Sequence, residues 1–529
     1  MSTNPKDVVF WNAYCASPSK HELPSIIYRT IGAYKVAHAV RAKGFSAQVI
    51  DFATLFSEEE LYQATVRFVD RNTTCLAIST TFLLDDWSIS RQTLDPKLKR
   101  VINRVLDEYP NLKLVFGGYG IGNLKKHVHE LNKDRVFFIS QYGEDIIVDV
   151  VRFLKNGGPS PKFDVELDPT GRVKILTCHA PIRPSFNIEC DRFRFAKEDC
   201  IQPGESLPIE LSRGCVFKCK FCNHLMLGRG KLDYLKSMEL VKEELIYNYE
   251  NWSVTNYYVL CDTFNDTEYK MKEWHKMVMS LPFKIQFTSY LRADLLDRFP
   301  DVPYMLKESG LVSAYHGIET LGKESSLLIG KAWSGKHART YVPKLYHDIW
   351  GGDVYQTVSL IGGLPGDTKA DLIDMAKWFR ENDLYNVRYH PLGLSTNLTA
   401  KNASEFERDA EKYGYTLNQN ATKRSDWAWK NEYWGTDKEL KKFLREEVMP
   451  LFDPHSLTMF VSWAIISVLQ YSRIAHNIKI TVDSFRKENL HELAMLDQPN
   501  IHGDMPPSPY LSVSAHRWLA GYKKSIMMA

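Results

Sequence analysis

The chain has no apolar stretch long enough to cross a membrane. Its longest apolar run, Leu457–Leu469, is shorter than the ~20 residues that a membrane-spanning helix needs, so we expect a buried helix there. The first residues, Met1–Asp7, contain no apolar signal region. These absences predict a soluble, cytoplasmic protein without a membrane partner.

An excess of charge of one sign is also missing. The sequence has 67 Lys and Arg residues against 64 Asp and Glu residues, which gives a formal net charge of +3. So small a charge is no nucleic-acid signature and no reason to expect an acidic membrane surface as a partner. At 529 residues and 44% hydrophobic content, the chain can form several domains, each with a sizeable core.

The nine cysteines form no disulfide framework, which favours a reducing compartment. Three of them lie in one short run. The other six are scattered along the chain: Cys15, Cys75, Cys178, Cys190, Cys200 and Cys261.

The run places Cys215, Cys219 and Cys222 at a C-x3-C-x2-C spacing. Three thiolates on one loop can hold three irons of a [4Fe–4S] cube and leave the fourth iron open to a small molecule. A structural zinc ion with His224 as its fourth ligand is an alternative, because such sites need four ligands. Buried cysteines without a metal are less expected, since two lysines and an arginine make the stretch polar.

Apolar strand patterns alternate with helical ones over the first ~150 residues, a length typical of one domain. The alternation predicts a Rossmann-like parallel sheet covered by helices, with ligands beyond the carboxyl ends of its strands. Two loops fall there, Ser79–Thr81 and the glycine-rich Gly117–Gly122, which lacks the order of a nicotinamide or flavin motif. The expected strands are Val8–Tyr14, Ala47–Asp51, Leu76–Thr80, Leu112–Phe116 and Val136–Ile139, and the expected helices include Thr30–Lys43 and Gly143–Lys155.

Proline and glycine then gather in the chain, which predicts a linker over residues 159–207 after a first domain over residues 1–158. Short extended pieces of this linker are expected to pack across the domain that follows. Strand–helix alternation resumes over residues 208–395 and predicts a partial (β/α)6 TIM-like barrel, whose chemistry sits at the carboxyl ends of its strands. The expected strands are Pro208–Leu211, Asn256–Leu260, Ile285–Ser289, Val312–Tyr315, Val354–Leu360 and Val387–His390.

The cysteine run, together with the strand-end motifs of this region, resembles the radical S-adenosylmethionine (SAM) superfamily. The resemblance covers roughly 190 residues, a full domain. It implies that Cys215, Cys219 and Cys222 bind the cluster and are catalytic, and that the backbone of Phe221 lies against the SAM adenine. In that family SAM chelates the open iron. One electron from the cluster then cleaves the sulfonium of SAM and yields a 5′-deoxyadenosyl radical.

The resemblance implies further SAM contacts, one after each of the following strands. Asp262 would position the amino group, and Arg292 would bind the carboxylate through its guanidinium. Glu319 would accept from the ribose hydroxyls or the amino group, and the turn from Gly363 to Pro365 would meet the adenine edge.

Each of these residues also has an ordinary structural explanation. Asp262 and Glu319 could merely cap the helices that follow them. Arg292 and Asp294 could form a weak surface pair. Pro365 could belong to a common turn.

The first domain resembles the cobalamin-binding domain that precedes many radical SAM domains, on Ile78–Thr80, Val115–Gly118 and Gln141–Asp145. The D-x-H-x-x-G motif of some cobalamin proteins is absent, and His21 in the first loop is better explained as a solvated residue. An empty Rossmann-like domain used as a scaffold is the alternative. The cobalamin contacts implied by the resemblance are Ser79, Thr80, Gly117, Gly118, Gly143 and Glu144.

Beyond the barrel we expect a mainly helical domain over residues 396–529 that caps the barrel and excludes water from it. Helical patterns cover Glu405–Tyr413, Lys438–Met449 and Leu457–Ile474. The tryptophan-rich stretch Trp427–Trp434 is expected in the core of this cap, with a substrate-lining role as the alternative.

The leading hypothesis is a radical SAM enzyme that modifies an unactivated carbon by cobalamin-dependent methyl transfer. Its cofactors would be a [4Fe–4S] cluster, SAM and cobalamin, and its electron donor a flavodoxin or ferredoxin. A cobalamin-free rearrangement, epimerisation or cyclisation is one alternative, and a non-catalytic iron–sulfur or zinc protein is another. The substrate cannot be derived from the sequence.

Overall fold

The computed structural model of the chain describes residues 4–12, 29–80, 94–118, 131, 135–140, 143–157, 163–167, 174–178, 191–203, 205–222, 234–331, 333–351, 353–384, 387–394, 403–420, 426–452 and 509–529. The chain divides into two compact units. The first consists of Met1–Asn187, Asp191–Glu205 and Ser512–Ala529, and the second of Ile188–Cys190 and Ser206–Leu511. Some predicted features lie outside the described residues: His21, residues 119–122, Gln141, Tyr142, His224 and the helix at Leu457–Ile474.

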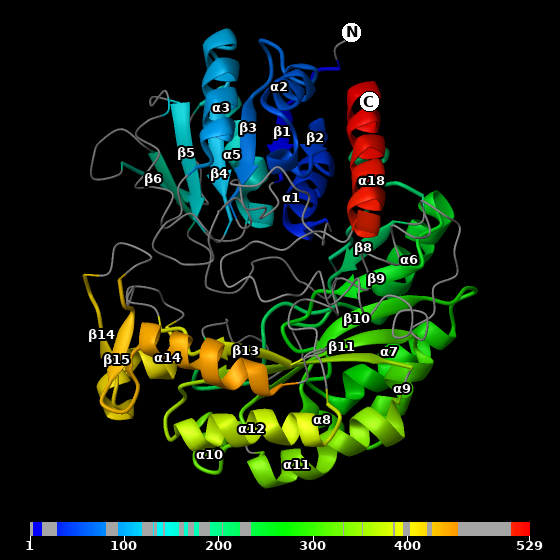
Figure 1. Cartoon of the computed structure of the whole chain (residues 1–529). Helices are drawn as coiled ribbons and strands as arrows, with labels where there is room; N and C mark the ends of the chain where they lie inside the picture. Colours follow the sequence, from blue (N-terminus) through cyan, green and yellow to red (C-terminus); the bar gives the residue numbers. More distant parts are fainter. Residues whose placement is uncertain are drawn as a thin grey trace. The chain divides into compact units, whose positions relative to one another are not determined.

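A seven-stranded sheet forms the centre of the first unit, with the order β2-β1-β3-β4-β5-β7-β6 (Figure 1). All neighbouring strands are parallel except β6 and β7. Every residue of β1 and β2 is buried, as expected for parallel strands covered on both faces. This confirms the predicted Rossmann-like sheet. Its first five strands are β1 (Val8–Trp11), β2 (Ala47–Ile50), β3 (Cys75–Ser79), β4 (Lys113–Gly117) and β5 (Val136–Ser140).

Helices pack in pairs beside this sheet: α1 (Ile31–Arg41) with α5 (Gly143–Asn156), and α2 (Glu58–Val66) with α3 (Pro96–Glu108). Local sequence explains where two of them begin. Ser57 and Glu60 form a capping box at the start of α2. Asp95 caps α3, and Pro96 occupies its first position.

Two strands lie within the predicted linker 159–207. Strand β7 (Lys174–Cys178) pairs in parallel with β5, and β6 (Phe163–Leu167) pairs antiparallel with β7 at the edge of the sheet. The short extended pieces expected in this stretch therefore exist, but they pair with the first sheet and not with the following domain. Because prolines and glycines surround these two short segments, no local pattern showed that they pair with each other and with β5.

The C-terminal helix α18 (Pro509–Met528) also departs from the prediction, because Ser512–Ala529 belongs to the first unit and not to a C-terminal cap. Its Trp518 and Tyr522 are buried and pack edge-on against Phe52. The backbone N–H of Asp51 donates to the Tyr522 hydroxyl at 2.7 Å. No local pattern could reveal a contact between residues so distant in sequence.

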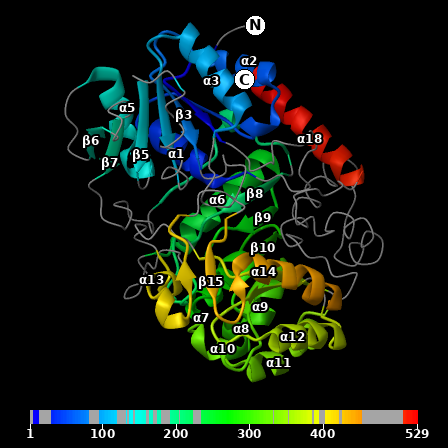
Figure 2. The same ribbon diagram turned by 60° about the vertical axis from the view of Figure 1, so that its left-hand side comes forward.

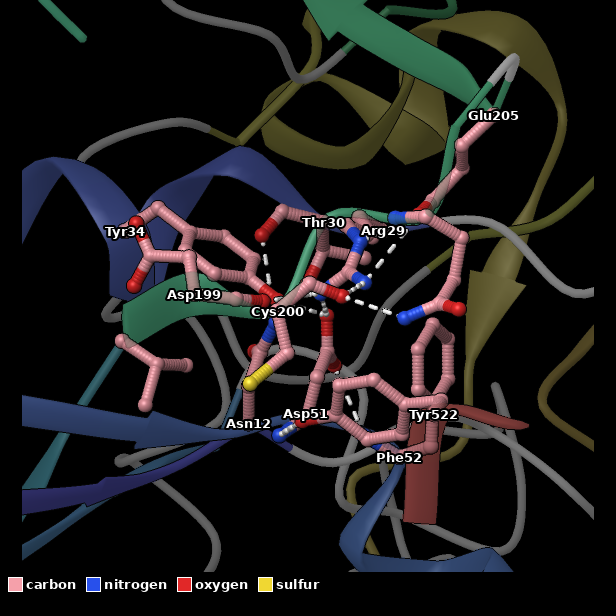
Figure 3. Close-up of polar contacts among 12 residues, drawn as sticks. Asn12, Arg29, Thr30, Tyr34, Asp51, Phe52, Asp199, Cys200, Glu205 and Tyr522 are labelled. Carbon is pink, nitrogen blue, oxygen red and sulfur yellow. Dashed lines mark hydrogen bonds and ion pairs between the residues drawn. The ribbon is translucent and has the colours of Figure 1, made fainter. Parts of the chain in front are cut away.

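A fully buried guanidinium links α18 to the segment that precedes the barrel (Figure 3). Nε of Arg29 donates to Glu205 Oε1 at 2.5 Å, and Nη2 donates to Glu205 Oε2 at 3.2 Å. The same guanidinium lies 5.0 Å from the ring centre of Tyr522 and 5.9 Å from that of Trp518. A buried charge is tolerated only when it is paired and hydrogen-bonded, and Arg29 meets that condition.

Six strands in sequential order, β8 to β13, form the sheet of the second unit, and every neighbouring pair is parallel. Helices cover it in Figures 1 and 2, so the predicted partial (β/α)6 barrel is confirmed. The strands are β8 (Ser206–Ile209), β9 (Asn256–Val259), β10 (Gln286–Leu291), β11 (Leu311–Glu319), β12 (Tyr355–Gly362) and β13 (Val387–Pro391). The helices are α6 (Met238–Trp252), α7 (Glu268–Met279), α8 (Ala293–Arg298), α9 (Val302–Glu308), α10 (Ser325–Leu328), α11 (Gly335–Pro343) and α12 (Lys369–Glu381).

The region after the barrel combines short helices with a three-stranded antiparallel sheet, which the prediction of a mainly helical domain missed. Trp429 is fully buried and donates from Nε1 to the carbonyl of Leu392 at 2.8 Å, so this tryptophan is a core residue. The elements are α13 (Glu405–Arg408), β14 (Thr416–Leu417), β15 (Trp429–Asn431), β16 (Gly435–Thr436) and α14 (Asp437–Phe443). Across the described ranges, no helix combines the length and the apolar character that a membrane crossing demands.

Candidate functional site

The cysteine loop leaves the barrel directly after β8 and is closed at its base. The backbone N–H of Arg213 donates to the carbonyl of Tyr234 at 3.2 Å, and that of Lys236 donates to the carbonyl of Leu211 at 2.7 Å. Gly214, immediately before the first cysteine, has a φ of +85°, a conformation that favours glycine. The loop is therefore a closed, turned segment and not a continuation of the strand.

Two of the three thiols meet hydrogen-bonding groups from neighbouring strand ends. Sγ of Cys215 lies 3.4 Å from the Thr263 hydroxyl and 3.5 Å from the backbone nitrogen of Phe217. Sγ of Cys219 lies 3.3 Å from Nη1 of Arg292. Donors aimed at sulfur stabilise a thiolate, which is the form that binds iron.

This donor set fits an iron–sulfur cube. Within the described ranges, no three His, Cys, Asp or Glu side chains are grouped so that they could hold one metal ion. The ligands of a cube bind different irons, so three thiols on one loop need not converge on a single point. Burial raises the pKa of the Cys215 thiol, while its bonds to Thr263 and Phe217 lower it in part.

The predicted SAM contacts lie where parallel strands end. Asp262 follows β9 and is exposed, Arg292 follows β10, Glu319 ends β11, and Gly363 follows β12. The carboxyl ends of parallel strands share one edge of the sheet, which is where barrels of this type place their chemistry. Phe221 connects this edge to the cysteine loop, because Lys331 lies 6.0 Å from its ring centre.

Arg292 is held on several sides. Its Nε and Nη2 donate to the two carboxylate oxygens of Asp294 at 3.0 and 2.7 Å, and both side chains are only 9% exposed. The guanidinium also lies over the ring of Phe217, 4.1 Å from its centre. Asn265 exchanges two 2.9 Å hydrogen bonds with the Arg292 backbone. The pair with Asp294 is therefore real, but it is buried and not a surface pair.

Glu319 adopts a left-handed backbone conformation, with a φ of +71°, at a register shift between β11 and β12. Such a conformation is costly for a residue with a side chain and often accompanies functional sites. Oε1 of Glu319 pairs with Nζ of Lys331 at 2.8 Å, and the same Nζ donates to the carbonyl of Gly317 at 2.6 Å. Glu319 does not cap α10, whose N-cap is Glu324.

The turn after β12 depends on Gly363, whose φ is +84°. Its carbonyl accepts from the Tyr415 hydroxyl at 2.6 Å. The N–H of Leu364 donates to Oδ2 of Asp367 at 2.9 Å, and burial raises the pKa of this carboxyl to about 7. The turn that contains Pro365 is therefore fixed by one hydrogen bond from Tyr415 and by another to its own Asp367.

Sequence reasoning missed Thr263, Asn265, Lys331 and Asp367. Thr263 and Asn265 lie in the Cys261–Asn265 stretch that ends β9, and Asp367 lies in the glycine-rich turn. Their position within these strand-end motifs was the sequence signal that could have identified these three residues. Lys331 has no motif, and only its contact with Glu319 reveals it.

In the first unit, four of the six predicted cobalamin contacts lie at the ends of two neighbouring strands, and two of these four are hydrogen-bonded to each other. Thr80 donates to the carbonyl of Gly117 through its backbone N–H at 2.7 Å and through its hydroxyl at 3.0 Å. Ser79 ends β3, and Gly118 has a φ of +108° beside them. These residues lie at the carboxyl ends of β3 and β4, next to the switch point between β1 and β3 where such sheets bind ligands.

The remaining two predicted contacts begin α5. A Cβ at Gly143 would lie 3.1 Å from Cγ2 of Val36 on α1, so this glycine permits two helices to approach closely. Glu144 follows it and is half-buried. Packing alone thus explains the glycine.

Comparison with known proteins agrees with this geometry. Residues 209–379 match the Radical SAM superfamily, whereas the search of curated proteins found no match. The structure of the radical S-adenosylmethionine methyltransferase TsrM from Kitasatospora setae, with cobalamin and a [4Fe–4S] cluster bound, is similar with a TM-score of 0.61. That likeness has 12% identity over 92% of this chain and 98% of TsrM.

A second similar structure is the cobalamin-dependent S-adenosylmethionine radical enzyme OxsB with aqua-cobalamin and S-adenosylmethionine bound. Its TM-score is 0.55 and its identity 13%, over 98% of this chain and 84% of OxsB. At such identities the likeness concerns the fold. The family match covers the cysteine loop and the strand ends through β12, so residues 209–379 form a domain of the Radical SAM superfamily.

Proposed function

We propose that this enzyme cleaves SAM reductively and transfers a methyl group to an unactivated carbon with the help of cobalamin. The observation that carries the proposal is the cysteine loop itself, with Cys215 and Cys219 already facing donors from the ends of β9 and β10. A bound [4Fe–4S] cluster would supply the electron that splits the sulfonium of SAM. Arg292, Glu319 and the Gly363 turn would hold the cofactor in place.

Cobalamin is proposed on two grounds. The whole-chain fold is similar to TsrM and OxsB, whose structures contain cobalamin. In addition, Thr80, Gly117 and Gly118 form a compact polar edge beside the switch point of the first sheet. A Cβ added at Gly117 would meet no atom of the described residues within 4 Å, so among these residues the edge has room beside it.

A cobalamin-free radical reaction is the alternative if the first unit serves only as a scaffold. A non-catalytic iron–sulfur or zinc protein is less well supported. Such a protein would not need Arg292, Glu319 and Gly363 at successive strand ends.

The first experiment is anaerobic reconstitution of the full chain with iron and sulfide, followed by addition of dithionite and SAM. We expect release of 5′-deoxyadenosine from the wild type and its loss in Cys219→Ala. The matched control is Cys200→Ser in the first unit, which should retain the activity. A wild-type chain that holds a complete cube yet releases no 5′-deoxyadenosine would refute the proposal.

The second experiment concerns cobalamin alone. Protein produced with the vitamin supplied should carry its visible absorbance. Gly117→Leu, which fills the space beside the strand end, should lose that absorbance and still release 5′-deoxyadenosine. Absence of absorbance in the wild type would leave the cobalamin-free alternative as the function.

Radical SAM enzymes require an electron donor, and we propose a flavodoxin or ferredoxin in that role. A reducing, cytoplasmic compartment is the proposed setting, because the cluster cysteines must remain thiolates.

A further inference from the structure

A buried ammonium lies behind the first cluster cysteine. Lys270 is on α7 and has no exposed surface. Its Nζ donates to the Ser212 hydroxyl at 3.0 Å and to the carbonyl of Thr263 at 3.3 Å, and it pairs with Asp266 at 3.4 Å. Burying a charge is costly without such partners, so a lysine here calls for an explanation beyond packing.

The partners of Lys270 connect it to both ends of the cysteine loop. Ser212 precedes the loop and forms an isolated antiparallel bridge with Leu235, which follows it. The hydroxyl of Tyr234, on the same returning segment, donates to Oδ2 of Asp266 at 2.8 Å. Lys270 and Asp266 therefore fix the two ends of the loop, Lys270 through Ser212 and Asp266 through Tyr234.

The same lysine positions the residue that touches the cluster ligand. Thr263 is buried, its carbonyl accepts from Lys270, and its hydroxyl lies 3.4 Å from Sγ of Cys215. When Cys215 is a thiolate bound to iron, its sulfur has no proton to give. The hydroxyl must then be the donor in this contact.

We propose that the Thr263 hydroxyl, held in place by Lys270, raises the reduction potential of the cluster. Uptake of one electron from the donor protein increases the negative charge on the cluster sulfurs, and a hydrogen bond to such a sulfur stabilises the reduced form. No covalent bond forms or breaks in this step. Thr263 and Lys270 act as positioning residues, and the inference depends on the proposed function only in requiring a [4Fe–4S] cube.

The test compares Thr263→Val with Thr263→Ser in the reconstituted full chain. Valine has the shape of threonine without the hydroxyl, and serine keeps the hydroxyl. Electron paramagnetic resonance during a redox titration without SAM gives the midpoint potential, and iron analysis gives the cluster content. We expect a more negative potential for Thr263→Val, an almost unchanged one for Thr263→Ser, and equal iron content in both.

Lys270→Met examines the positioning role. It should shift the potential in the same direction as Thr263→Val, and adding Thr263→Val to it should give less than the sum of the two shifts. Lys35→Met in the first unit is the matched control, because it removes a buried ammonium that pairs with Asp191 and lies on α1 of that unit, so the potential should not change. If Lys270→Met does not fold, the two Thr263 variants still decide the proposal.

Two negative results have different meanings. A full cube whose potential is the same in Thr263→Val and the wild type would overturn this inference and leave the proposed function intact. A wild-type chain that forms no [4Fe–4S] cube under reconstitution would overturn both.

Discussion

Nη1 of Arg292 lies 3.3 Å from Sγ of Cys219, while Nε and Nη2, on another edge of the same guanidinium, donate to the carboxylate of Asp294. One side chain thus contacts both a cluster ligand and an anion from its own helix. A guanidinium carries five N–H groups, so these contacts leave capacity for the carboxylate of SAM. We therefore expect the planar fork, and not charge alone, to matter for SAM binding.

The first prediction concerns that fork. Arg292→Lys keeps the charge, but a single ammonium cannot bind the Asp294 carboxylate and Sγ of Cys219 at once. We therefore expect the affinity for SAM to fall by about tenfold or more, which corresponds to roughly 1.4 kcal/mol. Equilibrium binding of SAM to the anaerobic, reconstituted chain measures this. Arg298→Lys, an exposed change on the same helix, is the control and should bind SAM normally. Equal affinities for the two variants would contradict a role for Arg292 in SAM binding.

The second prediction concerns the buried pair of Glu319 and Lys331. Lys331→Met leaves a carboxylate without its cation, so we expect a stability loss of ~3–5 kcal/mol together with weaker SAM binding. Denaturant unfolding and SAM titration check the two effects. The exposed Lys323→Met serves as the matched control. If stability falls but SAM affinity does not, the pair is structural only.

The third prediction concerns the turn after β12. A Cβ at Gly363 would lie 2.5 Å from Cδ2 of Leu440, and its φ of +84° disfavours any side chain. Gly363→Ala should therefore cost at least ~1–2 kcal/mol from backbone strain alone and should weaken SAM binding. Gly393→Ala, where a Cβ meets no atom of the described part of the chain within 4 Å, should be neutral in both thermal unfolding and SAM titration.

The fourth prediction is a pH dependence that arises from Asp367. Burial raises the pKa of this carboxyl from its ordinary value of 3.8 to about 7, so between these values the folded chain holds a proton that the unfolded chain has lost. Its contribution to stability is therefore complete below about pH 4 and disappears as the pH rises through about 7. Asp367→Asn stays neutral throughout and should gain stability relative to the wild type as the pH rises.

Urea unfolding of both proteins at pH 5 and pH 7.5 measures this difference. Asp51 in the first unit also has a pKa raised to about 7 by burial, but it is present in both proteins and cancels in the comparison. A wild-type-to-variant difference that does not change with pH would show that Asp367 is already ionised when folded.

The fifth prediction concerns the C-terminal helix. Trp518 and Tyr522 of α18 cover Arg29 and Phe52 of the first unit, so Trp518→Ala should destabilise that unit by ~3–5 kcal/mol. Met528→Ala, on the same helix and 71% exposed, is the control. A truncation that tests the region after the barrel should accordingly retain residues 509–529.

The sequence predicted the first five strands of the first sheet and the six strands of the second because each of them has a local apolar pattern. The cysteine loop was found from its spacing, whereas the residues at the ends of β9, β10, β11 and β12 were implied by the resemblance to the radical SAM superfamily. Strands β6 and β7 were missed, since short segments among prolines and glycines resemble a linker until their partners are known. The antiparallel sheet around Trp429 was missed because its strands, of two or three residues each, are too short to show an alternating pattern.

The sequence by itself determined the chemistry that this chain can carry: three thiols on one loop, and polar groups at the ends of successive parallel strands. Only the tertiary structure decided which side chains support those groups. It placed Lys270 beneath Thr263, Lys331 beside Glu319 and α18 against Arg29. These contacts join residues from different elements, so no local pattern encodes them, and burial makes each pairing necessary.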